Sequence, residues 1–211
     1  MSALPLFSPL LTAARVIPVL TIETVEEAVP LAEALRAGGI DVIEVTLRTR
    51  AALKACEAIA HHCKDVVLGI GTVITPSQVK EAKDAGARFL VTPATTEKLG
   101  RAVAEGGLPA LPGAATVSEM LALYEMGFHE MKFFPAEAAG GVDYLKSVAG
   151  PLADLKFCPT GGIAAANAEK YLALGNVLCV GGSWITPKAA VQTGKWVEIT
   201  RLAAEAAKLG R

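Results

Sequence analysis

Aromatic side chains, net charge and long apolar runs are all scarce in this 211-residue sequence. Phe, Trp and Tyr make up 5% of it, too few to favour the base-stacking surface of a single-stranded nucleic-acid binder. The formal net charge is −1, so there is no basic footprint for nucleic acid or for a membrane surface. The sequence is 52% hydrophobic, yet no uninterrupted apolar run reaches the length of a membrane-spanning helix. We therefore expect no nucleic-acid partner and no membrane association.

The cysteines lack the density and spacing of a disulfide scaffold or a zinc site, and no C-x-x-C pair occurs. A secretory signal would place basic residues before its apolar stretch, but the first basic residue, Arg15, follows the apolar segment Met1–Leu11. These features predict reduced thiols, no metal site and a cytoplasmic location. The four cysteines are Cys56, Cys63, Cys158 and Cys179.

Short apolar runs alternate with longer segments rich in Ala, Glu and Lys, and the alternation occurs eight times. Near-continuous runs of Val, Ile and Leu are typical of parallel strands that are covered by helices on their outer face. The predicted strands are Val16–Ile22, Val42–Leu47, Val66–Val73, Phe89–Ala94, Ala110–Ala114, Glu130–Ala136, Leu155–Gly161 and Val177–Ser183.

Helix-start and helix-stop signals separate these runs. Three intervening segments begin with a capping-box pattern, in which a Thr is followed three residues later by Glu or Gln. Glycines that permit a left-handed C-terminal cap end five of the segments. The capping boxes are Thr24–Glu27, Thr75–Gln78 and Thr116–Glu119, and the glycines are Gly38-Gly39, Gly86, Gly106-Gly107, Gly127 and Gly175.

Eight strand-then-helix units predict an α/β fold, a single (β/α)8 TIM barrel that forms one domain over residues 1–211. The chain is shorter than the ~250 residues typical of this fold, so the loops must be short. The alternative is a flavodoxin-like or Rossmann sheet. A dinucleotide-binding sheet of that kind places a glycine-rich turn after its first strand, and Val16–Thr24 contains no glycine. The barrel is therefore favoured.

A lysine stands in the middle of the sixth run, where residues 130–137 read EMKFFPAE. Burial disfavours a charged ammonium, and the neutral amine that results can attack a carbonyl carbon. The alternative is a lysine whose stem covers apolar surface while its head reaches water. Lys132 is thus a candidate nucleophile among apolar and aromatic neighbours.

Two charged residues lie on one face of the second run, because side chains alternate along a strand with a period of two. Glu44, Thr46 and Arg48 share that face. In a functional interpretation, Glu44 moves a proton and Arg48 holds a substrate carboxylate in a bidentate grip. The alternative is that Glu44 and Arg48 form a mutual ion pair that fixes strand register.

The third and fourth runs end in small or rigid residues. Gly69 and Gly71 allow the backbone to approach a ligand, and the Thr72 hydroxyl that follows can join Arg48 at a carboxylate. The Thr92–Ala94 segment contains Pro93 and is expected to form a wall of the pocket.

The last two runs end in glycine-rich turns that precede helices. Backbone N–H groups exposed by such turns bind anions, and phosphate sites in TIM barrels commonly form after strands 7 and 8. The alternative is that both turns are only flexible connections. The candidate phosphate-binding residues are Thr160, Gly161, Gly162, Gly181, Gly182 and Ser183.

With these residues in view, the sequence resembles the 2-keto-3-deoxy-6-phosphogluconate (KDPG) aldolase family, also described as 4-hydroxy-2-oxoglutarate (KHG) aldolases. The resemblance covers nearly the whole chain, from about Val16 to the C-terminal helix. The matching segments are EVTLR (44–48), GIGTV (69–73), KFFPAE (132–137), CPTGGI (158–163) and GGSW (181–184). Thr92 and Ala94 around Pro93, and Ala114-Ala115, depart from the expected pattern and affect only pocket shape.

The resemblance implies a Schiff-base aldolase of the Entner–Doudoroff pathway, a homotrimer with no metal or organic cofactor. By position, Lys132 resembles the imine-forming lysine and Glu44 the acid/base. Arg48 and Thr72 resemble the carboxylate grip, while Pro93 and Phe134 resemble pocket walls. The glycine-rich turns with Thr160 and Ser183 resemble the phosphate end.

The expected reaction is reversible cleavage of KDPG to pyruvate and glyceraldehyde 3-phosphate, with KHG, which yields pyruvate and glyoxylate, as a second substrate. The substrate partner is accordingly a small phosphorylated 2-keto acid. Two alternatives stay open: an aldolase for the C4 epimer, 2-keto-3-deoxy-6-phosphogalactonate, and a non-catalytic phosphosugar-binding barrel.

Overall fold

The computed structural model describes residues 4–210, so residues 1–3 and 211 of the predicted domain lie outside the described residues. Each of the eight predicted runs contains parallel strand. The fifth run forms two short strands, because it changes pairing partner at Pro112: its first half pairs with β4 and its second half with β7. The strands are β1 (Val16–Leu20), β2 (Val42–Thr46), β3 (Val67–Gly71), β4 (Phe89–Val91), β5 (Ala110–Leu111), β6 (Gly113–Ala114), β7 (Glu130–Phe133), β8 (Lys156–Pro159) and β9 (Val180–Gly182).

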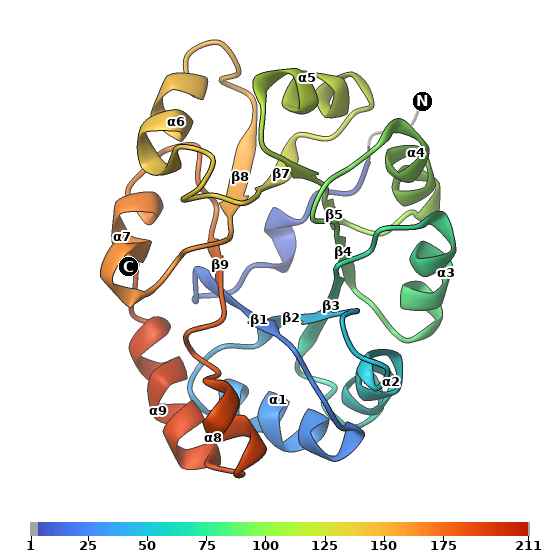
Figure 1. Ribbon diagram of the computed structural model, residues 1–211, viewed down its shortest axis with the longest axis vertical. Coiled ribbons are helices and arrows are strands. Elements are labelled where there is room, and N and C mark those ends of the chain that lie inside the picture. Colours follow the sequence, from blue (N-terminus) through green and yellow to red (C-terminus); the bar gives the residue numbers. More distant parts are fainter. Residues whose placement is uncertain (1–3, 211) are drawn as a thin grey trace.

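The strands form two parallel sheets, in the orders β5-β4-β3-β2-β1-β9 and β6-β7-β8. They curl as a half-barrel does, and the helices surround them (Figure 1). Two isolated bridges, Phe157–Val177 and Thr160–Gly181, connect the segment of β8 with that of β9. The predicted α/β fold with a parallel sheet is confirmed. The doubly wound alternative is wrong, because neighbours in the larger sheet follow chain order from β1 to β5 without the reversal that defines a switch point.

Helices occupy the segments between the strands, and the predicted caps explain where several begin and end. The Thr75 and Thr116 hydroxyls each accept a hydrogen bond from the backbone N–H three residues later. In return, the side chains of Gln78 and Glu119 accept hydrogen bonds from the backbone N–H of Thr75 and Thr116. Of the five segments predicted to end at a left-handed glycine, four do so, whereas Gly175 has no positive φ. The helices are η1 (Ser8–Leu10), η2 (Val25–Glu27), α1 (Ala28–Ala37), α2 (Ala52–His62), α3 (Pro76–Asp84), α4 (Glu97–Gly106), α5 (Val117–Glu125), α6 (Gly141–Val148), α7 (Ala165–Leu172), α8 (Lys188–Gln192) and α9 (Trp196–Ala206).

Among residues 4–210, no helix combines the length and the hydropathy needed to cross a membrane.

Side-chain alternation divides the apolar residues into two layers. On β2, Ile43 and Val45 belong to the large layer between strands and helices, while Val42 belongs to a smaller interior cluster. The N-terminal segment adds Phe7 to that interior, where its ring lies 4.8 Å from the ring of Phe89. The interior is therefore filled at the end where the strands begin, and the buried polar groups of the strands, except Glu130 at the start of β7, lie toward the other end. The interior cluster comprises Phe7, Ile17, Val42, Phe89, Val91, Leu111, Cys158 and Cys179.

Candidate active site

The predicted nucleophile is buried beside a carboxylate. Lys132 is 3% exposed, and its Nζ lies 3.2 Å from Oε1 of Glu44, a residue 88 positions earlier in the chain. The two side chains are 4% and 5% exposed, so the pair is shielded from water. The alternative in which the Lys132 amine reaches solvent is wrong. Pairing of β7 with both β6 and β8 fixes the backbone at this lysine.

Glu44 fits beside Lys132 because the neighbouring strand has a glycine. Strand β2 pairs with β3 in a register that places Thr46 opposite Gly71. A Cβ at position 71 would collide with Oε1 of Glu44. The sequence suggested that Gly71 brings backbone close to a ligand, but its main effect here is to make room for the carboxylate. Gly69 makes room in the same way for the ring of Phe89.

Arg48 and Thr72, predicted to act together, are brought together by the β2–β3 pairing. The Arg48 Nε donates to Oγ1 of Thr72 at 3.2 Å. Thr72 has φ = 58°, a left-handed conformation that is rare for a β-branched residue and costs on the order of 1–3 kcal/mol. Among residues 4–210, Glu44 pairs with Lys132 and not with Arg48, so the alternative of a Glu44–Arg48 ion pair is wrong.

The predicted pocket walls lie beside these groups. The Phe134 ring centroid is 5.5 Å from Nζ of Lys132. Pro93 is half-buried, and a Cβ at position 113 would collide with the Pro93 carbonyl, so Gly113 lets the two segments pack closely. The Thr92 hydroxyl accepts the Gly113 N–H at 2.8 Å and holds the same contact together.

The turn after β8 has the conformation that an anion site requires. Gly161 and Gly162 have φ of 100° and 80°, in the region that favours glycine. The carbonyls of the turn are used: Thr160 O accepts the Ala136 N–H and Gly161 O accepts the Glu137 N–H. Within residues 4–210, the N–H groups of Gly161 and Gly162 donate to no backbone or side-chain acceptor. They are free to bind a ligand.

The residues around β9 divide into two groups. The glycines serve packing, because a Cβ at position 181 would collide with the Thr160 hydroxyl and one at 182 with the Trp184 ring. The Thr160 hydroxyl thus faces Gly181 in the interior. Ser183, in contrast, is exposed.

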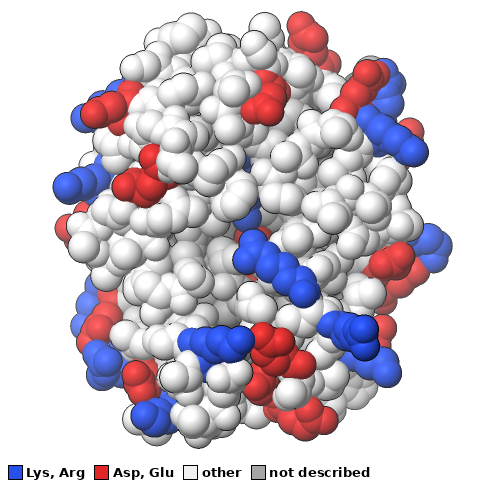
Figure 2. Space-filling view, in the orientation of Figure 1, with Lys and Arg blue, Asp and Glu red and all other residues white. Residues whose placement is uncertain are grey.

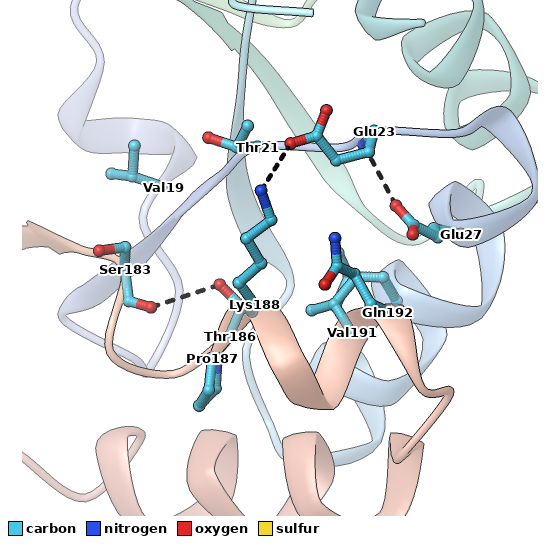
Figure 3. Close-up of a pocket in the computed structure, with 11 residues that line it drawn as sticks. Val19, Thr21, Glu23, Glu27, Ser183, Thr186, Pro187, Lys188, Val191 and Gln192 are labelled. Atoms are coloured by element: carbon cyan, nitrogen blue, oxygen red, sulfur yellow. Dashed lines mark hydrogen bonds and ion pairs between the residues drawn. The ribbon is translucent and has the colours of Figure 1, made fainter.

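Ser183 lines a cavity of about 320 Å³ between the end of β1 and the start of α8 (Figure 3). Thr21 lies on the same cavity, and sequence reasoning missed it because its strand carries no glycine signal. Lys188 spans the cavity, with its Nζ 3.2 Å from Oε1 of Glu23. A hydroxyl and an ion-paired ammonium group therefore line this cavity, to which Lys132, Glu44 and the Gly161–Gly162 turn do not contribute.

Most charged residues of the face in Figure 2 lie around its rim, and a few lie near its central hollow. Figure 2 shows a depression at the centre of the face, with basic and acidic atoms inside it. The Cys179 thiol in the interior is not activated, because burial and the nearby Cys158 thiol raise the pKa of Cys179 well above its usual value and make it a poor nucleophile. No cluster of three or more metal-ligand side chains occurs within residues 4–210.

The fold and this geometry define a class of protein: an α/β protein with a buried lysine–carboxylate pair at the carboxyl ends of parallel strands. The comparisons with known proteins go further. The family described as KDPG and KHG aldolase matches residues 8–202, and the chain belongs to this family. The predicted resemblance is confirmed.

The relatives are similar over nearly their whole length. The KHG/KDPG aldolase of Escherichia coli K12 is 49% identical over 93% of this chain and 92% of its own. The KDPG aldolase of Legionella pneumophila, crystallised with pyruvate as a covalent carbinolamine intermediate, is 50% identical, with a TM-score of 0.89 over 91% of this chain and 93% of its own. The Zymomonas mobilis ZM4 KDPG aldolase with 3-phosphoglycerate is 42% identical, with a TM-score of 0.88 over 93% and 92%.

Proposed function

We propose that this protein is a Schiff-base aldolase that cleaves KDPG reversibly to pyruvate and glyceraldehyde 3-phosphate. The observation that carries the proposal is the buried Lys132 amine, 3.2 Å from the Glu44 carboxylate, in a member of the KDPG and KHG aldolase family. The pyruvate carbinolamine in the Legionella relative supports covalent chemistry between an enzyme of this family and a 2-keto acid.

Glu44 is placed to make the amine reactive and then to move the substrate's protons. It accepts a proton from Lys132, whose lone pair attacks the C2 ketone and forms a carbinolamine. Glu44 returns this proton to the carbinolamine hydroxyl, which leaves as water, and a protonated imine forms while Glu44 becomes a carboxylate again. Glu44 then removes the C4 hydroxyl proton as the C3–C4 bond breaks, and the electron pair of that bond moves to the imine and yields an enamine. Protonation of the enamine at C3 and hydrolysis release pyruvate and restore the lysine.

The two ends of the substrate are held by the groups on either side of this centre. Arg48 and Thr72 bind the C1 carboxylate, and the guanidinium fork suits a carboxylate geometrically. The free N–H groups of Gly161 and Gly162 bind the phosphate, with Ser183 as a hydroxyl donor. Phosphate binding lies away from the breaking bond, so its binding energy can position the substrate and raise the rate.

The scaffold we propose for this chemistry is a closed eight-stranded barrel in one domain over residues 1–211. Two features support closure: the fifth run pairs with β4 and then with β7, and the bridge Thr160–Gly181 connects the remaining edges. We propose a homotrimer in the cytoplasm, supported by the family resemblance, by exposed apolar side chains at Ile74, Val117 and Leu121, and by four free cysteines. Light scattering tests the trimer.

The decisive experiment is borohydride reduction in the presence of pyruvate, followed by peptide mass mapping. Reduction of the imine fixes a lactyl-sized adduct on the lysine that formed it, and we expect that adduct on Lys132. An unmodified Lys132 at saturating pyruvate would refute the mechanism and leave a phosphosugar-binding barrel.

Two further activities are separated by substrate comparison. KHG is a second candidate substrate because the family and the E. coli relative both carry that name. The phosphogalactonate epimer differs only at C4, and the naming of the relatives after KDPG favours the gluconate configuration. Pyruvate release in a coupled assay with each substrate ranks the three and distinguishes all of them from a non-catalytic binder.

A further inference from the structure

Tyr171 is a large, fully buried side chain whose hydroxyl reaches a segment of the active site. It lies on α7, is 0% exposed, and donates a hydrogen bond to Oε1 of Glu137, the last residue of the KFFPAE segment. Burial, together with the Glu137 carboxylate, raises the pKa of Tyr171 well above its usual value. The phenol therefore stays protonated at neutral pH and can donate this hydrogen bond. The mechanism described above does not use this pair.

Glu137 is packed against the phosphate-binding turn. A Cβ at position 162 would lie 2.6 Å from Cγ of Glu137, so the glycine allows the Glu137 stem to rest on the turn. The backbone reinforces the contact, because the Glu137 N–H donates to Gly161 O at 3.1 Å. One residue earlier, the Ala136 N–H donates to Thr160 O at 2.8 Å. The segment after the lysine strand and the turn thus form one hydrogen-bonded unit.

Helix α7 holds this unit at two points. Near its start, Nδ2 of Asn167 donates to Gly162 O at 3.1 Å, while its Oδ1 accepts the Ala164 N–H at 2.8 Å. About one turn further along, Tyr171 holds Glu137. A Cβ at position 161 would lie 3.2 Å from the Phe134 ring, so the turn also borders the pocket wall beside Lys132.

We infer that the Tyr171–Glu137 hydrogen bond positions the Gly161–Gly162 turn relative to Lys132 and so sets the reach from the imine to the phosphate. Both are positioning residues, since neither is placed to touch the reacting atoms. The inference rests on the proposed function. Lys132 itself is held by β6, β8 and Glu44, so loss of the bond moves the phosphate end and leaves imine formation intact.

The test compares a phosphorylated with an unphosphorylated substrate in Tyr171→Phe. We expect KM for KDPG to rise about five- to tenfold, less than the full effect of losing one hydrogen bond to a charged group because neither residue touches the substrate, with kcat little changed. KM for KHG and the rate of borohydride trapping with pyruvate should stay within about twofold. Tyr144→Phe is the matched control: its ring stacks on Phe133, and within residues 4–210 its hydroxyl makes no hydrogen bond.

Two variants of Glu137 separate positioning from folding, because this residue is exposed and its replacement does not open the core. Glu137→Ala should raise KM for KDPG as much as Tyr171→Phe does. Glu137→Gln keeps a hydrogen-bond acceptor, so its KM for KDPG should stay within about twofold of the wild-type value. The double variant, Tyr171→Phe with Glu137→Ala, should show no further increase in KM. Equal losses on KDPG and KHG, or an unchanged KM for KDPG, would overturn the inference. The wild type in the same assay tests the proposed function separately, since absence of pyruvate release there would refute the aldolase itself.

Discussion

Strand β7 carries two buried charged residues on the same inward face, and they differ in what surrounds them. Glu130, at the start of the strand, is 6% exposed, and its carboxylate accepts the backbone N–H groups of Phe7 and Ser8. Lys132, two residues later, is 3% exposed, and within residues 4–210 its amine hydrogen-bonds to one side chain, the ionisable Glu44. One charge is satisfied by the fixed backbone of the N-terminal segment, and the other by a group that can exchange a proton with it.

This difference distinguishes a buried charged residue that stabilises the fold from one that can take part in a reaction. Backbone N–H groups cannot move or titrate, so the Glu130 contacts fasten Phe7 into the interior and close that end of the strands. A lysine and a carboxylate exchange protons, and they lie where the interior cluster ends and polar residues begin. Position along one strand therefore assigns the two residues opposite roles, which substitutions can test.

The largest expected effect is on the chemical side of the comparison. Lys132→Ala removes the amine that forms the imine, so KDPG cleavage should fall at least about a thousandfold. Pyruvate trapping by borohydride should vanish in the same variant. Substantial aldolase activity in correctly folded Lys132→Ala, checked by circular dichroism, would reject the Schiff-base mechanism.

Glu130→Gln tests the structural side. The amide keeps the shape but replaces a charged acceptor by a neutral one and points an NH2 group toward backbone donors. We expect the free energy of unfolding, measured by urea denaturation, to fall by about 2 kcal/mol, with KM and pyruvate trapping unchanged. A loss of trapping without a loss of stability would show that the two ends of β7 are not separate in function.

The sequence predicted the chemical end of β7 better than the structural end. Lys132 and Glu44 stood out because charged residues in apolar strands are rare, and for Glu44 the period of two also predicted which face it shares. Glu130 has the same appearance, but its partners are backbone groups of Phe7 and Ser8, more than 120 positions away. Backbone donors leave no trace in the residue types of a sequence.

Glycines set a second limit on what could be predicted from the sequence. A glycine in a strand end indicates close approach but does not name the group that approaches. Gly71 was interpreted as facing a ligand, yet it faces Glu44, and Gly181 faces Thr160. Gly161 and Gly162, whose free N–H groups follow a strand and precede a helix, kept their predicted geometry.

The strand runs themselves were identified correctly, since parallel strands are apolar on both faces; only the change of partner at Pro112 required coordinates.

The next prediction concerns the open end of the site. Arg48→Lys keeps the charge but loses the planar fork that suits a carboxylate, so the Kd for pyruvate should rise about tenfold, measured by the concentration dependence of borohydride trapping. Arg50→Lys is the control, because within residues 4–210 Arg50 forms no ion pair. Equal pyruvate affinity in Arg48→Lys and the wild type would leave Arg48 only its contact with Thr72.

The smallest expected effect lies furthest from the lysine. Ser183 is exposed, and its hydroxyl is one of several donors that we propose for the phosphate, so Ser183→Ala should raise KM for KDPG by about three- to fivefold. KHG has no phosphate, and its KM should not change. A selective effect on KDPG would show that a side chain away from the reacting atoms alters discrimination between substrates. The buried lysine–carboxylate pair, in contrast, is expected to alter the rate for every 2-keto acid. Equal losses on both substrates would remove Ser183 from phosphate binding and leave the free N–H groups of the Gly161–Gly162 turn as the anion site.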